Sequence, residues 1–299
     1  DPTGGGVEPG IGVDGYLTGL HMLGDGSDGT LDFSSGDVTI DTDVKDEYQL
    51  TSLTVPVGRK LILKGSKPLT LLVMGDVNIG GIVDASGLPG QDATYYDIHD
   101  EGEDGYGSEG GRGGPGGGDG GSIGEYTWKQ TTTVAGEDGE PGYGAKSTSI
   151  GRKGVGVIYR YGKGSSSYDY YGVGGSGAGH VQDGQDGSEG LSGGSYPKTP
   201  PSGGDMYGDS QLSNGLEGGS GGGSGSAVTF YYSPASTYTY VGFGLSSGGG
   251  GGGGGGALRI TAGGKVTVDK CGAILANGGD GGDVIQYYPN GSLPYYYTR

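Results

Sequence analysis

The chain has 299 residues, including 79 glycines and 13 prolines, and its formal net charge is −18. This much glycine excludes a helical domain, because each glycine inside a helix costs about 1 kcal/mol relative to alanine. The negative charge makes nucleic acid and anionic lipid unfavourable partners, and no apolar stretch reaches the roughly 18 residues that span a membrane. The single cysteine, Cys271, allows no disulfide framework, and its apolar surroundings predict a small buried residue.

Residues 1–23 are rich in glycine and proline and predict an extended N-terminal tail. The tail carries apolar residues at alternating or near-alternating positions, Val7, Ile11 and Val13. We expect it to add as a strand to a neighbouring subunit, with these residues as assembly contacts. A chain that begins at Asp1 rather than methionine fits a processed secreted protein or a trimmed chain.

Residues 24–87 predict the first part of a β framework. A turn cluster, Gly24–Gly29, precedes short apolar stretches that are separated by glycine, aspartate or proline. The expected strands are Thr30–Phe33, Val38–Ile40, Tyr48–Val55, Lys60–Lys64, Leu69–Met74, Val77–Ile79 and Ile82–Ala85. Such spacing without helical connections predicts an all-β fold, either a sandwich or a β-helix-like stack.

The framework is repeated near the other end of the chain, in residues 257–286. Val77 and Ile79 match Val266 and Val268, and the stretch 81–87 then matches 272–278. Each copy has apolar residues at every second position and therefore only one face to bury. We expect the two copies to stack on each other or on neighbouring strands.

Residues 88–256 form a glycine- and tyrosine-rich insert between the two halves. Glycine-dense segments alternate with segments that carry tyrosine and β-branched residues. One interpretation is a set of flexible linkers, since a glycine chain gains little to offset its ordering entropy. The other is a bundle of polyproline-II-like runs that pack closely because glycine has no side chain.

Residues 287–299 form a tyrosine-rich C-terminal tail, and the whole chain has 23 tyrosines against 3 phenylalanines. Exposed tyrosine offers a flat ring with a polar tip, which suits contacts with proteins or sugars. Subunit contact, glycan contact and internal packing all remain open as roles. The predicted assembly contacts in the tail are Tyr287, Tyr288, Tyr295, Tyr296 and Tyr297.

The order of these segments resembles the glycine-rich, β-rich surface proteins. The residues that carry the resemblance are GDGSDG at 24–29, TSLTVPVG at 51–58, GDVNIGGIVDASG at 75–87 and the stretch from the glycine run at 248–256 to Gly282. Proteins of this group occur as phage tail or head fibre proteins and as secreted bacterial or archaeal exoproteins. The resemblance implies a structural or adhesive role outside the cell, on a cell or virion surface.

Two acidic turns are candidates for calcium, which prefers oxygen ligands. Asp25 and Asp28 lie in the first turn cluster, and Asp280 and Asp283 lie in a single match to the calcium-binding nonapeptide. The alternative is a solvated acidic surface without a bound ion. Calcium is the only cofactor that the sequence suggests.

No constellation of nucleophile, base and acid is visible. Two matches to G-x-S-x-G, at 190–194 and 218–222, lack the strand before and the helix after that an active serine requires. The three histidines, His21, His99 and His180, have no zinc-ligand spacing and are expected at the surface. The sequence therefore predicts a non-enzymatic subunit of an extracellular filament that self-assembles through β edges and tyrosines. The alternative is a phage tail-fibre or adhesin module that binds a host glycan or protein.

Overall fold

The computed structural model shows a β-rich protein. It describes residues 23–93, 104–105, 107–124, 126–127, 132–134, 136–145, 147–154, 157–159, 169–171, 175–180, 182–187, 192–193, 200–208, 215–231, 243–283 and 285–286. Every regular element in these ranges is a strand, and none is a helix. The all-β expectation is therefore confirmed at the level of strand content and parallel sheets.

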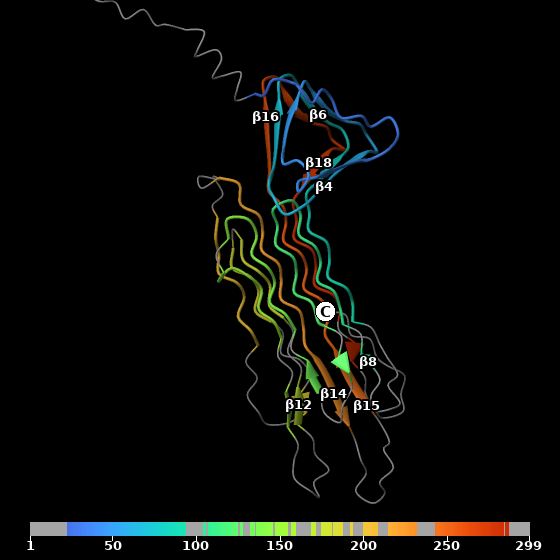
Figure 1. Cartoon of the computed structure of the whole chain (residues 1–299), viewed down its shortest axis with the longest axis vertical. Coiled ribbons are helices and arrows are strands. Elements are labelled where there is room, and N and C mark those ends of the chain that lie inside the picture. Colours follow the sequence, from blue (N-terminus) through green and yellow to red (C-terminus); the bar gives the residue numbers. More distant parts are fainter. Residues whose placement is uncertain are drawn as a thin grey trace, which may run out of the picture.

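Ten strands form three parallel sheets at one end of the molecule (Figure 1). They are β1 (Val38–Asp41), β2 (Glu47–Leu50), β3 (Leu53–Val55), β4 (Lys60–Lys64), β5 (Leu69–Val73), β6 (Val77–Ile79), β7 (Ile82–Asp84), β16 (Leu258–Ala262), β17 (Val266–Val268) and β18 (Ala273–Leu275). The first sheet has the order β2-β5-β16, the second β3-β6-β17 and the third β1-β4-β7-β18. The chain thus visits the three sheets in turn. After β1, each lap of three strands adds one parallel strand to each sheet: β2–β4 form the first lap, β5–β7 the second and β16–β18 the third.

Alternation of apolar and polar residues explains why these segments form half-buried strands. In β4 the sequence KLILK buries Leu61 and Leu63 and exposes Lys60, Ile62 and Lys64. In β5 Leu69, Leu71 and Val73 are fully buried. These side chains meet in one core between the three sheets, where each contributes about 1.5–3 kcal/mol through burial.

The repeat seen in the sequence is a pair of stacked laps. Val266 pairs with Val77 and Val268 with Ile79, and Ala273 pairs with Ile82. This is the register that the alignment of the two copies predicts, so the expectation that they stack is confirmed. The expected strand at Thr30–Phe33 is wrong: this stretch has no strand, and only Gly29 bridges to Leu50.

Glycine-rich runs lie side by side between the parallel sheets and the far end of the molecule (Figure 1). Neighbouring runs are joined by backbone hydrogen bonds, such as Gly118 N–H to the Gly219 carbonyl (2.9 Å) and Gly254 N–H to the Gly118 carbonyl (2.8 Å). We call this set of hydrogen-bonded runs the glycine lattice. Its two central runs are residues 218–226 and 248–256.

The central run 248–256 has a different neighbour on each of three sides. A Cβ on any residue from Gly249 to Gly256 would overlap a neighbouring run. The neighbour repeats every three residues: run 276–282 for Gly249, Gly252 and Gly255, run 109–115 for Gly250, Gly253 and Gly256, and run 219–222 for Gly251 and Gly254. Three residues is the period of a polyproline II helix, and it explains why every position in this run is glycine.

Runs at the edge of the lattice need glycine less often. In the run 136–143, Gly136, Gly139 and Gly142 face neighbouring runs, and a Cβ on any of them would overlap a backbone carbonyl. Serine stands at some interior positions because its hydroxyl bonds to nearby backbone. Ser224 Oγ accepts from Glu137 N (2.8 Å) and donates to the Ser122 carbonyl (3.0 Å).

Short strands gather at the end of the lattice that lies away from the parallel sheets, where Figure 1 labels β8, β12, β14 and β15. Their pairing is antiparallel, in contrast to that of the ten strands in the parallel sheets. The strands are β8 (Asp104–Gly105), β9 (Tyr126–Thr127), β10 (Thr132–Val134), β11 (Val157–Tyr159), β12 (Asp169–Tyr171), β13 (Ser192–Gly193), β14 (Ala227–Tyr231), β15 (Phe243–Ser247) and β19 (Ile285–Gln286). We call this group the far-end strands.

Candidate functional site

The last lap of the parallel sheets leaves an apolar end uncovered. Val266, Val268 and Ile274 are 51%, 48% and 45% exposed, although their strands pair with β6 and β7, whose inward residues are fully buried. Leu258 and Ile260 in β16 are only partly buried. The inward positions that are fully buried in β6 and β7 are thus half-exposed in β17 and β18.

Unpaired strand edges surround this apolar end. Among the described strands, β16, β17 and β18 each have a partner on one side only. Their outer N–H and C=O groups form the kind of edge that other strands can join. We call the three edges and the apolar residues between them the open end. Cys271 lies beside it and is exposed, so the expectation that it is buried is wrong.

The opposite end of the stack is closed by the segment before β1. Gly29 bridges to Leu50, Thr51 N–H donates to the Gly29 carbonyl (2.8 Å), and Asp28 N–H donates to the Gln49 carbonyl (2.9 Å). Phe33 is buried in the core at this end. The apolar core is therefore covered at one end of the stack and half-exposed at the other, although β1 and β3 at the covered end also have a partner on one side only among the described strands.

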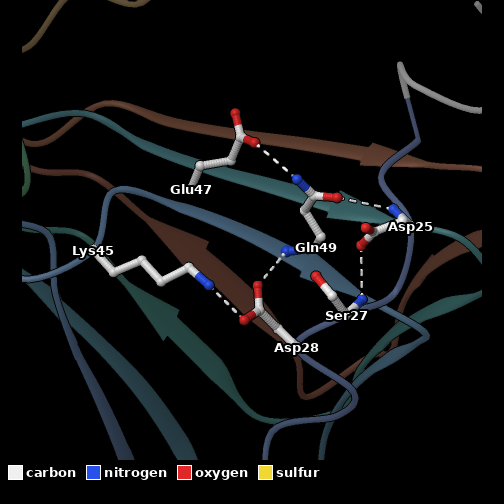
Figure 2. Close-up of polar contacts among 6 residues, drawn as sticks. All are labelled: Asp25, Ser27, Asp28, Lys45, Glu47 and Gln49. Atoms are coloured by element: carbon white, nitrogen blue, oxygen red, sulfur yellow. Dashed lines mark hydrogen bonds and ion pairs between the residues drawn. The ribbon is translucent and has the colours of Figure 1, made fainter.

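We call residues 25–33, which cover this end, the closing segment. Side-chain contacts hold it against β2 (Figure 2). Asp28 Oδ2 accepts from Gln49 N (2.8 Å), and its Oδ1 forms an ion pair with Lys45. Asp25 N–H donates to Gln49 Oε1 (2.9 Å), while Asp25 Oδ1 accepts from Ser27 N (2.8 Å). The pKa of Asp28 is lowered mainly by the hydrogen bond from Gln49 N and secondly by the contact with Lys45. Hydrogen bonds from Ser27 lower the pKa of Asp25.

The four aspartates proposed for calcium belong to two different parts of the molecule. Asp25 and Asp28 hold the closing segment, whereas Asp280 and Asp283 lie in the lattice run 276–283. The carbonyls of Asp280 and Asp283 accept from Gly90 N and Ala93 N (2.9 Å each). In the part of the chain that the structure describes, no three His, Cys, Asp or Glu side chains gather as a metal site would require.

A polar aromatic cluster in the lattice was not predicted from the sequence. The rings of His180 and Tyr207 meet edge to face, 5.0 Å apart, and the buried Tyr207 hydroxyl donates to the Gly218 carbonyl. Ser220 Oγ lies 3.2 Å from the same hydroxyl. Burial raises the pKa of Tyr207 and lowers that of His180, with Glu217 opposing the His180 shift. Glycine context alone gives no signal that these residues meet, because they are distant in sequence.

The predicted assembly contacts fall outside the described residues. This holds for Val7, Ile11 and Val13 in the first tail and for all five tyrosines of the C-terminal tail. Other tyrosines do lie on the far-end strands, where the backbone is described: Tyr126, Tyr159, Tyr170, Tyr171 and Tyr231. The structure thus brings part of the tyrosine-rich sequence to the end that lies away from the open end (Figure 1).

No helix within the described ranges is long and apolar enough to cross a membrane. Comparison of the chain with protein-family models, with curated proteins and with solved structures found no significant match.

Proposed function

We propose that this protein is the terminal adhesive module of an extracellular fibre, on a cell or virion surface, and that it has no enzymatic activity. In this proposal the parallel sheets form a three-sided β-helix that joins the module to the end of another β stack. The glycine lattice is a bundle of polyproline II runs that acts as a rigid spacer. The far-end strands present tyrosine-rich segments to a surface glycan or protein.

The observation that carries the proposal is the difference between the two ends of the strand stack. A subunit that stacks head to tail needs two uncovered ends, since a heterologous contact propagates only when both faces are available. Here the segment around Asp28 and Phe33 covers one end, and the half-exposed valines of β17 lie at the other. A stack with one open end completes an assembly instead of extending it.

The partner that fits the open end is another stack of parallel strands. Val266, Val268 and Ile274 occupy inward core positions, so the groups that cover them must also be inward apolar residues of a further lap. The three open edges demand hydrogen bonds from strands at the same level. A fibre stalk that ends in β strands meets both requirements.

A filament subunit is the second candidate. It draws support from the open end and from tyrosine, but it requires a second contact surface. The N-terminal tail and the C-terminal tyrosines were predicted to supply that surface, and both lie outside the described residues. Filament growth would then depend on those tails and not on stacking of the parallel sheets.

Electron microscopy and sedimentation of the purified protein test the two candidates. The terminal module predicts monomers or end-to-end pairs at high concentration, also with calcium present. Val268→Lys should abolish the pairs, because it places a charge in the apolar end. The matched control is Thr267→Lys on the same strand, whose side chain points to the other face. Filaments of many copies would instead establish the filament subunit.

A glycan array and cell-surface binding test the adhesive half. Protein labelled at Cys271, the single cysteine, is applied as the parent, as Val268→Lys and with Tyr159, Tyr170 and Tyr171 changed to serine. We expect Val268→Lys to bind as well as the parent and the tyrosine variant to lose binding. Equal binding by all three proteins, or no binding at all, would contradict the adhesive role.

A further inference from the structure

A groove of about 810 Å³ runs along one side of the glycine lattice. The two central runs form its floor, one through residues 249–253 and the other through Ser220, Gly222, Gly223 and Gly225. Residues 175–178 form one wall and 278–283 the other, and residues 183–186 line the rim beside the first wall. The groove follows the central runs along the side of the lattice, and at one end its lining residues Gly225, Gly249 and Asp283 lie two residues from the far-end strands β14, β15 and β19.

The central run 248–256 leaves one row of hydrogen-bond donors unused on the floor of this groove. With three residues per turn, an extended run has three donor directions and three acceptor directions, and hence up to six neighbours. Its carbonyls bond in all three directions, to runs 219–225, 276–282 and 111–114, and its N–H groups bond to runs 85–91 and 115–121. Within the described chain, Gly249 N–H and Gly252 N–H, which share the third donor direction, have no acceptor.

The other central run leaves a row of acceptors unused in the same groove. The carbonyls of Gly219 and Gly222 accept from run 118–121, and those of Gly221 and Ser224 accept from run 151–154. The carbonyls of Ser220 and Gly223, in the third direction, accept no hydrogen bond from any described residue. Both Ser220 and Gly223 line the groove.

The two unused rows identify one missing neighbour. Each central run has five neighbours from the described chain, and the sixth position, which lies in the groove, is common to both runs. Gly249 and Gly252 are buried residues, and a buried N–H without a partner is uncommon in folded proteins. The groove therefore has the hydrogen-bonding pattern of a lattice position that one more extended run would fill.

The charge at the rims restricts what could fill it. The carboxylates along the groove are Asp280 and Asp283 on one side and Asp183 and Asp186 on the other, and no lysine or arginine lines it. Asp183 and Asp186 each already accept one backbone hydrogen bond, from Met206 N (2.7 Å) and Gly203 N (2.8 Å). The rims thus favour a cationic occupant, whereas the floor offers only backbone groups.

We propose that the groove binds one extended, glycine-rich, basic segment of a partner protein, which takes the vacant lattice position. Its carbonyls accept from Gly249 and Gly252, and its N–H groups donate to Ser220 and Gly223. Because the floor has no room for side chains next to these groups, glycine recurs at every third position of the segment. Its lysine or arginine side chains lie toward the aspartates of the rims.

Peptide binding followed by calorimetry tests the proposal. The probe is a peptide of about 15 residues that repeats Gly-Gly-Lys. The controls are a Gly-Gly-Glu repeat and a peptide of the same length and composition as the probe, whose lysines are spaced without the three-residue period. We expect the first peptide to bind at least about tenfold more tightly than either control. Equal binding of the two lysine peptides would reduce the site to general attraction between charges and overturn the proposal.

Variants of the groove locate the peptide. Gly281→Leu fills the groove from its wall, where a Cβ meets nothing closer than 3.7 Å, and should weaken binding at least about tenfold. Asp280→Asn with Asp283→Asn should weaken it less and reduce its dependence on salt. Asp205→Asn, outside the groove, is the matched control and should change nothing.

Residue-resolved hydrogen exchange gives an independent readout. The amides of Gly249 and Gly252 should become protected when the Gly-Gly-Lys peptide binds. If their exchange is unchanged, or if Gly281→Leu binds as well as the parent protein, then water alone occupies the position and the proposal is wrong.

Discussion

Two glycine-to-alanine substitutions should change stability in opposite directions, although both lie in the glycine lattice. Gly252 belongs to the central run, where an added Cβ would overlap the carbonyl oxygen of Gly279. Gly281 belongs to the wall of the groove, where the nearest atom to an added Cβ is 3.7 Å away. Neither glycine has a positive φ, so alanine strains neither backbone.

The magnitudes follow from these contacts. Relieving the overlap in Gly252→Ala requires the run 276–282 to move away, which weakens the hydrogen bonds from Gly279 N and Gly282 N to the central run (2.7 and 2.8 Å). Two such bonds at about 1 kcal/mol each, with about 1–3 kcal/mol for overpacking, outweigh the 0.4–1 kcal/mol that alanine gains through the unfolded chain. We expect Gly252→Ala to lose about 2–4 kcal/mol, and Gly281→Ala to gain about 0.4–1 kcal/mol.

Urea unfolding of the two variants, followed by far-ultraviolet circular dichroism, measures both free energies. The slope of each transition is the internal control, because a change in slope would show that the unfolded state or the cooperativity had changed. Equal effects at both positions would refute the argument, since a set of flexible glycine linkers would respond alike to either alanine.

Three further predictions concern the strand stack and the buried cluster. Val77→Ala should cost about 2–3 kcal/mol, while Val266→Ala should cost less than about 1 kcal/mol, because Val77 is fully buried and Val266 is half-exposed; urea unfolding measures both, and equal costs would mean that the third lap is covered. The pKa of Asp28 is lowered in the folded protein, so its contribution to stability is present above its ordinary pKa near 3.8 and is lost as the pH falls below it; Asp28→Asn should differ from the parent at pH 6 and converge with it at the acid end. The pKa of Tyr207 is raised above 10.0, so its contribution is present below that pH and is lost as the pH rises beyond it; Tyr207→Phe should cost about 1 kcal/mol at pH 7 and should unfold at high pH with a weaker pH dependence than the parent.

The strand framework could be predicted from the sequence because its apolar residues alternate. The pattern located β4, β5 and β6, and the repeat predicted the pairing of Val77 with Val266. It could not distinguish a middle lap from the last lap, because the inward residues are β-branched and apolar in both: Val77 and Ile79 in one, Val266 and Val268 in the other. Exposure of Val266 and of Cys271 depends on whether a further lap follows, and that information is not local.

The closing segment and the lattice were harder to predict for different reasons. Phe33 closes the core from a stretch without regular strand hydrogen bonds, so a strand pattern gave the wrong structure for it. In the lattice, the density of glycine does report position: an unbroken run such as 248–256 is central, and glycine at every third residue marks an edge. The identity of each neighbour stays hidden, because identical glycines carry no register. The contact between His180 and Tyr207 and the vacant lattice position in the groove both depend on which runs are neighbours, so neither could be predicted from the sequence.

The stacking of β16–β18 on β5–β7 has a consequence for how the protein is made. Roughly 170 residues separate the two laps in the chain, and at 5–20 residues per second a ribosome needs about 10–35 s to synthesise them. Throughout that interval the edges of β5, β6 and β7 stay unpaired, because β16–β18 have not yet been synthesised. An unpaired edge can pair with the wrong strand. Early formation of the glycine lattice, or shielding by a chaperone, would shorten the time for which these edges stay exposed before β16–β18 pair with them.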